Sequence, residues 1–124
     1  MATARYKITL TVQSSCKEAE KLGSWNYKIN TGGLSIAGVG STTGENMSAY
    51  AAVLHGIIDA MKTLENPCFI TVRTRQLAIV QTALGIKERG WKPKGRAPWS
   101  QVDLWHKLVD TANKGGHKIA FEHI

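Results

Sequence analysis

Apolar and polar residues alternate strictly near the start of the chain. Between residues 5 and 13, every second residue is apolar and those between are polar. The apolar residues are Tyr6, Ile8, Leu10 and Val12. A period of two is typical of a β-strand with one buried face. We therefore expect a strand over residues 5–13 that ends at Ser14 and Ser15.

Two further strands are expected before the pattern changes. Residues 24–30 and 34–40 are predicted to pair as a hairpin, with Thr31-Gly32-Gly33 as the tight turn between them. Gly38 and Gly40 have no side chains to pack, so we expect the third strand to weaken near its end.

The period lengthens in the middle of the chain. Between residues 45 and 64 the apolar residues recur at helical spacing: Met47, Tyr50, Ala51, Leu54, Ile58 and Met61. This spacing predicts an amphipathic helix, which Asn66-Pro67 ends. Residues 68–74 alternate again and predict a fourth strand, and residues 76–87 suit a short helix.

The last amphipathic helix is expected after Ser100, which is placed to cap it, with Asp103 at its positive end. Its apolar face consists of Val102, Trp105, Leu108, Val109 and Ala112. A Gly115-Gly116 pair ends this helix, and residues 117–124 predict a final strand. The pattern is that of a single α/β domain over residues 1–124, because no linker or repeat interrupts it.

Charge narrows the range of partners. The chain has 16 Lys and Arg against 9 Asp and Glu, a formal net charge of +7 and a pI near 9.7, which favours nucleic acid first and an anionic membrane surface second. No apolar run approaches the roughly 20 residues that span a bilayer, and no signal-peptide core is present, so we expect a cytoplasmic protein. Cys16 and Cys68 are expected to be reduced, although their spacing leaves a pair open.

Cations and aromatic rings are interleaved just before the last helix. Five cations fall within ten residues, opposed only by Glu88: Lys87, Arg89, Lys92, Lys94 and Arg96. Such density must be solvated or face a polyanion, and Trp91 among the cations indicates base or sugar contacts beside phosphate contacts. The alternative is a solvated loop whose tryptophans pack on the body of the protein.

The order of the elements and three local segments resemble bacterial-type ribonucleases H. The segments are Glu45-Asn46-Met47 with the helix that follows, Thr74 to Gln81, and Arg89 to Leu108. The resemblance covers nearly the whole chain and implies the ribonuclease H fold, a mixed five-stranded sheet with three antiparallel strands followed by alternating helices and strands. The family's C-terminal helix is missing here.

Without that helix, one sheet face is expected to be uncovered. The apolar side chains expected there are Leu10, Val12 and Ile119 or Phe121. An exposed apolar face attracts a partner, so we expect a homodimer or a docked partner protein, and no membrane.

The resemblance also implies a catalytic site in which carboxylates hold two magnesium ions beside the scissile phosphate. At the matching positions this chain has Gln13 and Arg75 in place of two aspartates and Ser48 in place of a glutamate, and it ends before the fourth acid. Amides, hydroxyls and guanidinium groups do not hold hard cations. We therefore expect no catalytic residues, no metal and no cofactor.

Binding residues implied by the resemblance are retained. By position, the groove contacts are Cys16, Asn46 and Gln81, and the basic protrusion that grips phosphates is Lys87, Arg89, Trp91, Lys92, Lys94 and Arg96. Arg75 is either a phosphate contact, which we favour, or a surface cation. The leading hypothesis is an inactive ribonuclease H-like protein that binds RNA–DNA hybrid, structured RNA or another duplex. The compact chain suggests a viral origin, which would place it in the host cytoplasm.

Two alternatives stay open. One is a divergent metal-dependent ribonuclease H that cleaves RNA in RNA–DNA hybrids, with magnesium held by Glu45 or by a carboxylate of another subunit. The other is a protein-interaction module that keeps the fold as a scaffold and docks an acidic protein through its basic loop. The four histidines show no paired spacing on one element, so they predict no metal site.

Overall fold

The computed structural model describes residues 6–45, 47–88 and 102–124. These residues form five strands, three helices and one short 3-10 turn: β1 (Tyr6–Lys17), η1 (Glu18–Glu20), β2 (Leu22–Thr31), β3 (Leu34–Thr43), α1 (Ala49–Lys62), β4 (Cys68–Thr74), α2 (Leu77–Glu88), α3 (Val102–Gly115) and β5 (Lys118–His123). None of the described helices has the length and apolarity to cross a membrane. Cys16 and Cys68 are both free thiols.

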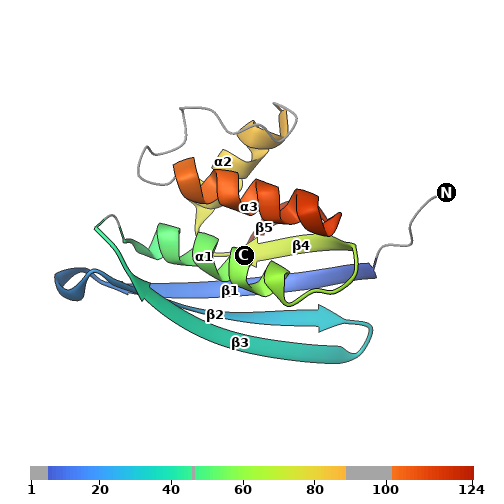
Figure 1. Ribbon diagram of the computed structural model, residues 1–124, viewed down its shortest axis with the longest axis horizontal. Helices are drawn as coiled ribbons and strands as arrows, with labels where there is room; N and C mark the ends of the chain where they lie inside the picture. Colours follow the sequence, from blue (N-terminus) through green and yellow to red (C-terminus); the bar gives the residue numbers. More distant parts are fainter. Residues whose placement is uncertain (1–5, 46, 89–101) are drawn as a thin grey trace.

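The five strands form one mixed sheet in the order β3-β2-β1-β4-β5 (Figure 1). β1 pairs antiparallel with β2, and β2 antiparallel with β3. β4 pairs in parallel with both β1 and β5. This topology confirms the expected mixed sheet of three antiparallel strands followed by alternating helices and strands.

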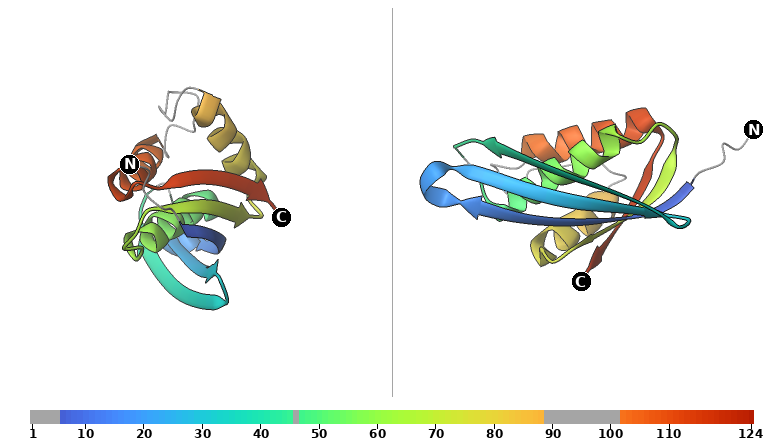
Figure 2. Two further views of the ribbon diagram at one scale, coloured as in Figure 1. Left: turned by 90° about the vertical axis from the view of Figure 1, so that its right-hand side faces the viewer. Right: turned by 90° about the horizontal axis from the view of Figure 1, so that it is seen from below.

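α1 and α3 pack side by side on one face of the sheet, and α2 contacts β4 and β5. Seen from below, β1, β2 and β3 lie in front of α1 and α3, and no described helix covers the face turned to the viewer (Figure 2, right). The sheet therefore has one helix-covered face and one face that the described helices leave open around its antiparallel half.

The apolar alternation of β1 faces the helices. Ile8, Leu10 and Val12 are 5%, 1% and 1% exposed and join a core with residues of α1, α3 and β4. Ile119 is 9% exposed, and the Phe121 ring lies 5.9 Å from the Trp105 ring, partly buried. The prediction that these side chains are uncovered is wrong, because α1 and α3 lie on their face of the sheet.

β1 and β2 are longer than their sequence predicts. Ser14 and Ser15 continue β1 rather than ending it, since they pair with Trp25 and Ser24 of β2. The reversal comes later, at η1, where Lys21 adopts a left-handed φ of 50°. Cross-strand pairing thus outweighs the weak strand preference of the two serines.

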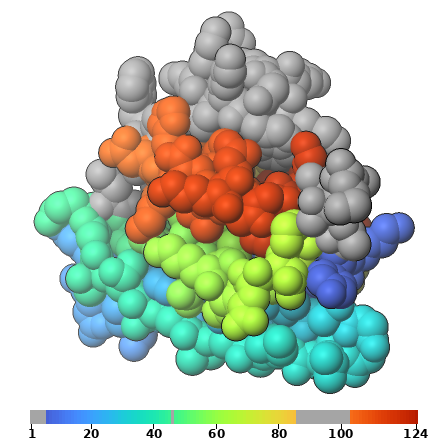
Figure 3. All heavy atoms as spheres, turned by 45° about the vertical axis from the view of Figure 1, so that its right-hand side comes forward, coloured from blue at the N-terminus to red at the C-terminus, as the bar shows by residue number. Residues whose placement is uncertain are grey.

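β3 also runs further than predicted, through Thr43. The tight turn before it is as expected, with Gly32 and Gly33 at φ values of 50° and 97°. Gly38 and Gly40 do not end the strand and pair with Tyr27 and Trp25 of β2, whose rings would collide with a side chain at either position. In the space-filling view β3 (teal) lies along the lower border of the molecule (Figure 3).

α1 begins at Ala49 rather than at residue 45. Ser48 is its N-cap, and the Ser48 hydroxyl accepts a hydrogen bond from the Ala51 backbone N–H at 3.0 Å. This cap satisfies one of the free N–H groups of the first turn and sets where the helix starts. The bounds of β4 agree with the prediction, and α2 starts and ends one residue later than predicted.

A chain of hydrogen bonds joins the three helices. Trp105 of α3, fully buried, donates its indole N–H to the Tyr50 hydroxyl at 2.9 Å, and Tyr50 donates to the Thr82 hydroxyl of α2 at 3.2 Å. Trp105 is therefore a core residue, as its place on the apolar helix face predicts. The chain fixes α2 relative to α1 and α3, and α2 begins next to the site described below.

Candidate functional site

The second half of β1 and the end of β4 border a cavity of about 260 Å³. Its lining comes from β1, α1 and the β4–α2 connection: Val12, Gln13, Ser14, Val53, Thr74, Arg75 and Gln76. The parallel register pairs Thr11 with Arg73, so Gln13 on β1 and Arg75, directly after the end of β4, each lie two residues further along. Gln13, Ser48 and Arg75 are the three positions at which the resemblance places metal-binding acids. The structure brings two of them, Gln13 and Arg75, into one cavity.

Ser48, the third position, lies at the start of α1 beside the same end of β1. The Ser14 hydroxyl donates a hydrogen bond to the Ala49 carbonyl at 2.7 Å, which ties β1 to the first turn of α1. The Ser48 side chain is occupied in capping the helix and does not line the cavity. Its role in this structure is to fix α1 against the site.

The other wall of the cavity is set by the connection from β4 to α2. Thr74 is fully buried, and its hydroxyl accepts a hydrogen bond from the Gln76 backbone N–H at 3.1 Å. The Gln76 carbonyl in turn accepts from the Ile79 N–H at 3.0 Å, inside the first turn of α2. These bonds hold Arg75 in a short, defined segment between strand and helix.

The cavity has a positive electrostatic character. Arg75 is exposed, and α2 begins at Leu77, directly after Gln76 of the lining. Free N–H groups at a helix start carry partial positive charge and favour anions. Among the described residues that line the cavity there is no carboxylate to offset these groups.

Glu45 is the acid that precedes α1 in the sequence, and its side chain is engaged elsewhere. It forms an exposed ion pair with Lys21, whose backbone carbonyl also accepts from the Gly44 N–H at 3.1 Å. Across the part of the chain that the structure describes, no three His, Cys, Asp or Glu side chains gather where they could hold a metal ion.

The donor set at the cavity does not fit a divalent cation. Magnesium is held by carboxylate oxygens and water, whereas the cavity presents an amide from Gln13, hydroxyls from Ser14 and Thr74, and a guanidinium from Arg75. The exposed amide of Gln13 and guanidinium of Arg75 donate hydrogen bonds well to phosphate or carboxylate oxygens, whereas the Ser14 hydroxyl already donates to the Ala49 carbonyl and Thr74 is buried. The site is chemically suited to an anion.

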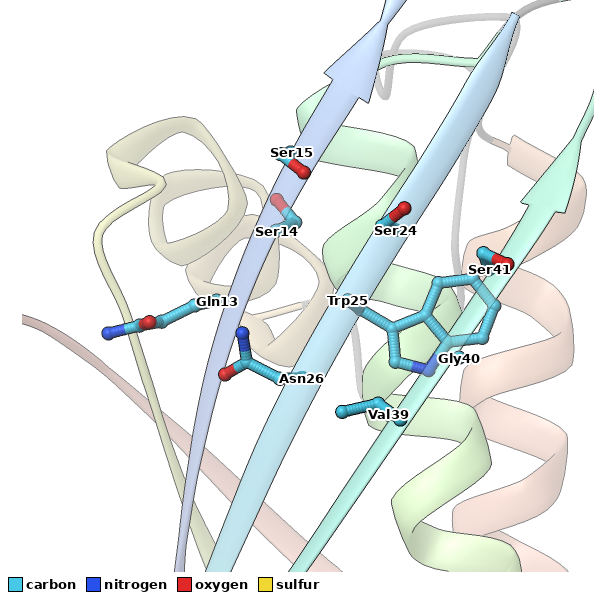
Figure 4. Close-up of a pocket in the computed structure, with 9 residues that line it drawn as sticks. All are labelled: Gln13, Ser14, Ser15, Ser24, Trp25, Asn26, Val39, Gly40 and Ser41. Atoms are coloured by element: carbon cyan, nitrogen blue, oxygen red, sulfur yellow. The ribbon is translucent and has the colours of Figure 1, made fainter.

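A second, open cavity of about 500 Å³ adjoins the first and shares Gln13 and Ser14 with it. It lies over β1, β2 and β3, and most of its polar lining consists of hydroxyl and amide side chains: Gln13, Ser14, Ser15, Ser24, Asn26 and Ser41 (Figure 4). The Gln13 side chain points away from β2, while Asn26 leans toward β1. The polar surface that begins at the first cavity therefore continues, as neutral hydroxyl and amide groups, over the antiparallel strands β1, β2 and β3.

Two of the predicted groove contacts lie within the described structure. Cys16, half-buried on β1, pairs with Gly23, and Met47 packs over that glycine. Gln81 is exposed on α2, one turn after the helix begins. Neither residue lines the cavity between β1 and β4, and their role as groove contacts stays a prediction.

The remaining predicted contacts cannot be placed. Asn46, Arg89, Trp91, Lys92, Lys94 and Arg96 lie outside the described residues, and Lys87 is in α2 without a described side chain. Ser14, Thr74 and Gln76 line the cavity although sequence reasoning did not select them. The signal that could have found them is their position, since each is next in sequence to Gln13 or Arg75.

Comparisons of sequence point to one group of proteins, although no family model matches the chain. A curated protein named ribonuclease H from Herminiimonas arsenicoxydans is 30% identical over 125 residues, which cover 95% of this chain and 81% of that protein. Ribonuclease H from Cupriavidus metallidurans is 29% identical with the same coverage. Ribonuclease H from Verminephrobacter eiseniae is 25% identical over 95% of this chain and 77% of its own length.

Solved structures share the fold. LC9-RNase H1, described as a type 1 RNase H with the type 2 active-site motif, superposes with a TM-score of 0.71 at 16% identity, and this chain spans 65% of its length. The N-terminal RNase H domain of rv2228c from Mycobacterium tuberculosis has a TM-score of 0.66 at 12% identity, over 96% of this chain and 82% of that one. With the same fold and a relative that is 30% identical over 95% of this chain and 81% of its own length, this chain belongs to the ribonuclease H family.

Proposed function

We propose that this chain is a catalytically inactive member of the family that binds nucleic acid. The observation that carries the proposal is the chemistry of the cavity between β1 and β4. Its described lining combines the amide of Gln13 with the guanidinium of Arg75 and has no carboxylate. Such groups attract phosphate but do not hold magnesium, so binding is separated from metal-dependent cleavage.

The resemblance to ribonucleases H supports the choice of ligand. In that family, carboxylates at the positions of Gln13, Ser48 and Arg75 hold the metal ions of the cleavage reaction. Neutral and cationic residues at these positions remove the repulsion that phosphate would otherwise meet. The ligands that fit are RNA–DNA hybrid, structured RNA or another duplex, recognised by backbone and shape more than by sequence.

The charge of the chain supports the same ligand class. The formal net charge is +7, and five cations fall within residues 87–96. We propose that this basic segment grips phosphates while the cavity receives the backbone next to it. The side chains of this segment lie outside the described structure.

A divergent nuclease would depend on Glu45 or on an acid from another subunit. The Glu45 carboxylate is ion-paired with Lys21 and is not part of the cavity lining. One carboxylate is also too few for a site that holds two metal ions. Both points favour binding without cleavage.

The proposal is tested with labelled RNA–DNA hybrid, double-stranded RNA, double-stranded DNA and single strands, each with magnesium, manganese or a chelator. We expect binding on native gels that does not depend on metal, and intact strands on denaturing gels. Magnesium-dependent cleavage that is lost in Glu45→Gln would establish the nuclease instead. Absence of both binding and cleavage at low salt would favour a protein-interaction module.

A further inference from the structure

β3 is one edge of the sheet, and it is an unprotected edge. Its ten residues, Leu34–Thr43, include no charge and no proline. The opposite edge, β5, carries Lys118, Glu122 and His123 within six residues. Edge strands commonly carry charges, prolines or bulges, because their free N–H and C=O groups otherwise pair with another strand.

Large apolar side chains accompany this free edge. Leu34, Ile36 and Val39 are 69%, 50% and 80% exposed, and no residue of β3 is buried. The net charge of +7 opposes contact between two copies over most surfaces, but β3 itself contributes no cation to that repulsion. The edge is therefore suited to a second copy of the same chain.

We propose that β3 is a homodimer interface, in which the β3 strands of two copies pair antiparallel about a two-fold axis. Such pairing satisfies the free backbone groups of both strands at once and joins the two sheets into one. No ion pair between the two β3 strands is needed, because neither strand has a charged residue.

The distribution of large and small residues selects one register. In a two-fold pairing centred on Ala37, Leu34 lies opposite the partner's Gly40 and Ile36 opposite the partner's Gly38. Each large side chain then meets a position without a side chain, on the same face of the joined sheet. Val39, on the other face, lies opposite the partner's Ser35.

The glycines also present aromatic surface to the incoming strand. The Trp25 indole extends across β3 beside Gly40 (Figure 4), stacked on the His55 ring at 5.5 Å. The Tyr27 ring lies over Gly38 in the same way. In the chosen register Leu34 approaches the partner's Trp25, so the pairing buries apolar surface from both copies.

The proposed dimer leaves the cavity between β1 and β4 accessible. In the strand order β3-β2-β1-β4-β5, two strands separate the β3 edge from that cavity's β4 wall. The interface does not involve the β1–β4 cavity that carries the proposed function, so either proposal can fail without the other.

Cysteine crosslinking tests the register. Ala37→Cys is made in a chain with Cys16→Ser, which leaves only the buried Cys68. We expect rapid formation of a covalent dimer under mild oxidation, because paired strand positions lie about 5.5 Å apart, within disulfide reach. The matched control is Thr43→Cys, exposed on the same face of β3, whose counterpart would lie twelve residues along the strand, about 40 Å away.

Sedimentation velocity over a wide range of protein concentration tests the association itself. The unmodified chain is expected to form dimers that Ile36→Lys converts to monomers, while Ala120→Lys on β5 leaves them intact; thermal melts confirm that both variants fold. Equal crosslinking of the two cysteine variants, or dimers unaffected by Ile36→Lys, would overturn the proposal. A monomer at every concentration would also overturn it and leave the edge to a strand of another protein.

Discussion

Gln13 of β1 and Arg75, directly after β4, line one cavity, and together they combine a fixed positive charge with an amide that both donates and accepts hydrogen bonds. Within the described part of the chain, no hydrogen bond or ion pair joins the Arg75 side chain to another residue. Arg75 is exposed, and none of the described acidic residues pairs with its guanidinium. This is the arrangement expected of a group that contacts phosphate.

Replacing Arg75 by glutamine removes the charge and keeps a polar side chain. We expect affinity for the preferred nucleic acid to fall roughly ten- to hundredfold, since a hydrogen bond to a charged group contributes about 1.5–3 kcal/mol. The matched control is Arg73→Gln, because Arg73 lies 3.6 Å from Glu122 and outside the cavity. Anisotropy titrations measure both variants, and equal losses would contradict a specific role for Arg75.

Proximity of Gln13 and Arg75 could be predicted from the sequence, because both strands alternate clearly and the chain resembles a known fold. The roles of Ser14 and Thr74 could not. Each depends on a hydrogen bond to the backbone of a neighbouring segment, to the Ala49 carbonyl or from the Gln76 N–H, that exists only after the helices dock. Alternation shows which side chains share a face but not which backbone groups they reach.

At the scale of elements, a buried imidazole joins the α3–β5 turn to the start of β4. His117 is 7% exposed, and its Nδ1 accepts a hydrogen bond from the Cys68 backbone N–H at 3.1 Å. The turn itself requires Gly116 at a φ of 70°. Burial lowers the pKa of His117 below its ordinary value of 6.5, which keeps the acceptor nitrogen unprotonated.

This bond predicts a loss of stability in acid. Because the pKa of His117 is lower in the folded than in the unfolded chain, the unfolded chain binds more protons as pH falls below 6.5. The contribution of His117 to the free energy of unfolding should be constant above pH 6.5 and should decrease as the pH falls below that value. Burial, and then the charge of Lys107, also lower the pKa of His55, which acts in the same direction.

Denaturant titrations at a series of pH values measure this effect. We expect His117→Gln to reduce the slope of stability against pH in the acid range, whereas His106→Gln, exposed on α3, should leave it unchanged. If both variants keep the slope of the unmodified chain, the imidazole is not the responsible group.

Element types follow from the sequence more closely than element ends. Ser14 and Ser15 predict the end of β1, yet pairing with β2 carries the strand on to Lys17. Apolar spacing predicts a helix from residue 45, yet the Ser48 cap delays it to Ala49. In the first case the boundary is set by pairing with a distant strand, and in the second by a capping side chain. The hydrophobic period alone contains neither piece of information.

At the scale of the whole molecule, the dominant property is positive charge that is unevenly placed along the chain. Of the 16 Lys and Arg residues, five fall within residues 87–96. On the described sheet face opposite the helices, by contrast, Lys7 and Lys118 flank Phe69 in adjoining strands. In the proposed binding mode the cations of residues 87–96 contact phosphates, whereas Lys7 and Lys118 do not.

Salt dependence distinguishes these two groups. Each phosphate contact contributes about 0.7–0.9 to the slope of log K against log salt, so Lys92→Ala with Arg96→Ala should reduce that slope by about 1.4–1.8. Lys7→Ala with Lys118→Ala makes the same change in net charge and should leave the slope nearly unchanged. Equal changes in the two double variants would assign the effect to net charge alone.

A backbone hydrogen bond between the end of the described chain and the end of β4 has a practical consequence. The Ile124 N–H donates to the Thr74 carbonyl at 3.1 Å, so the last described residue is anchored one position before Arg75. A fluorophore attached at residue 124 would therefore sit at the rim of the cavity. Quenching or polarisation of such a dye would report occupancy of the cavity directly, with unlabelled nucleic acid as the titrant.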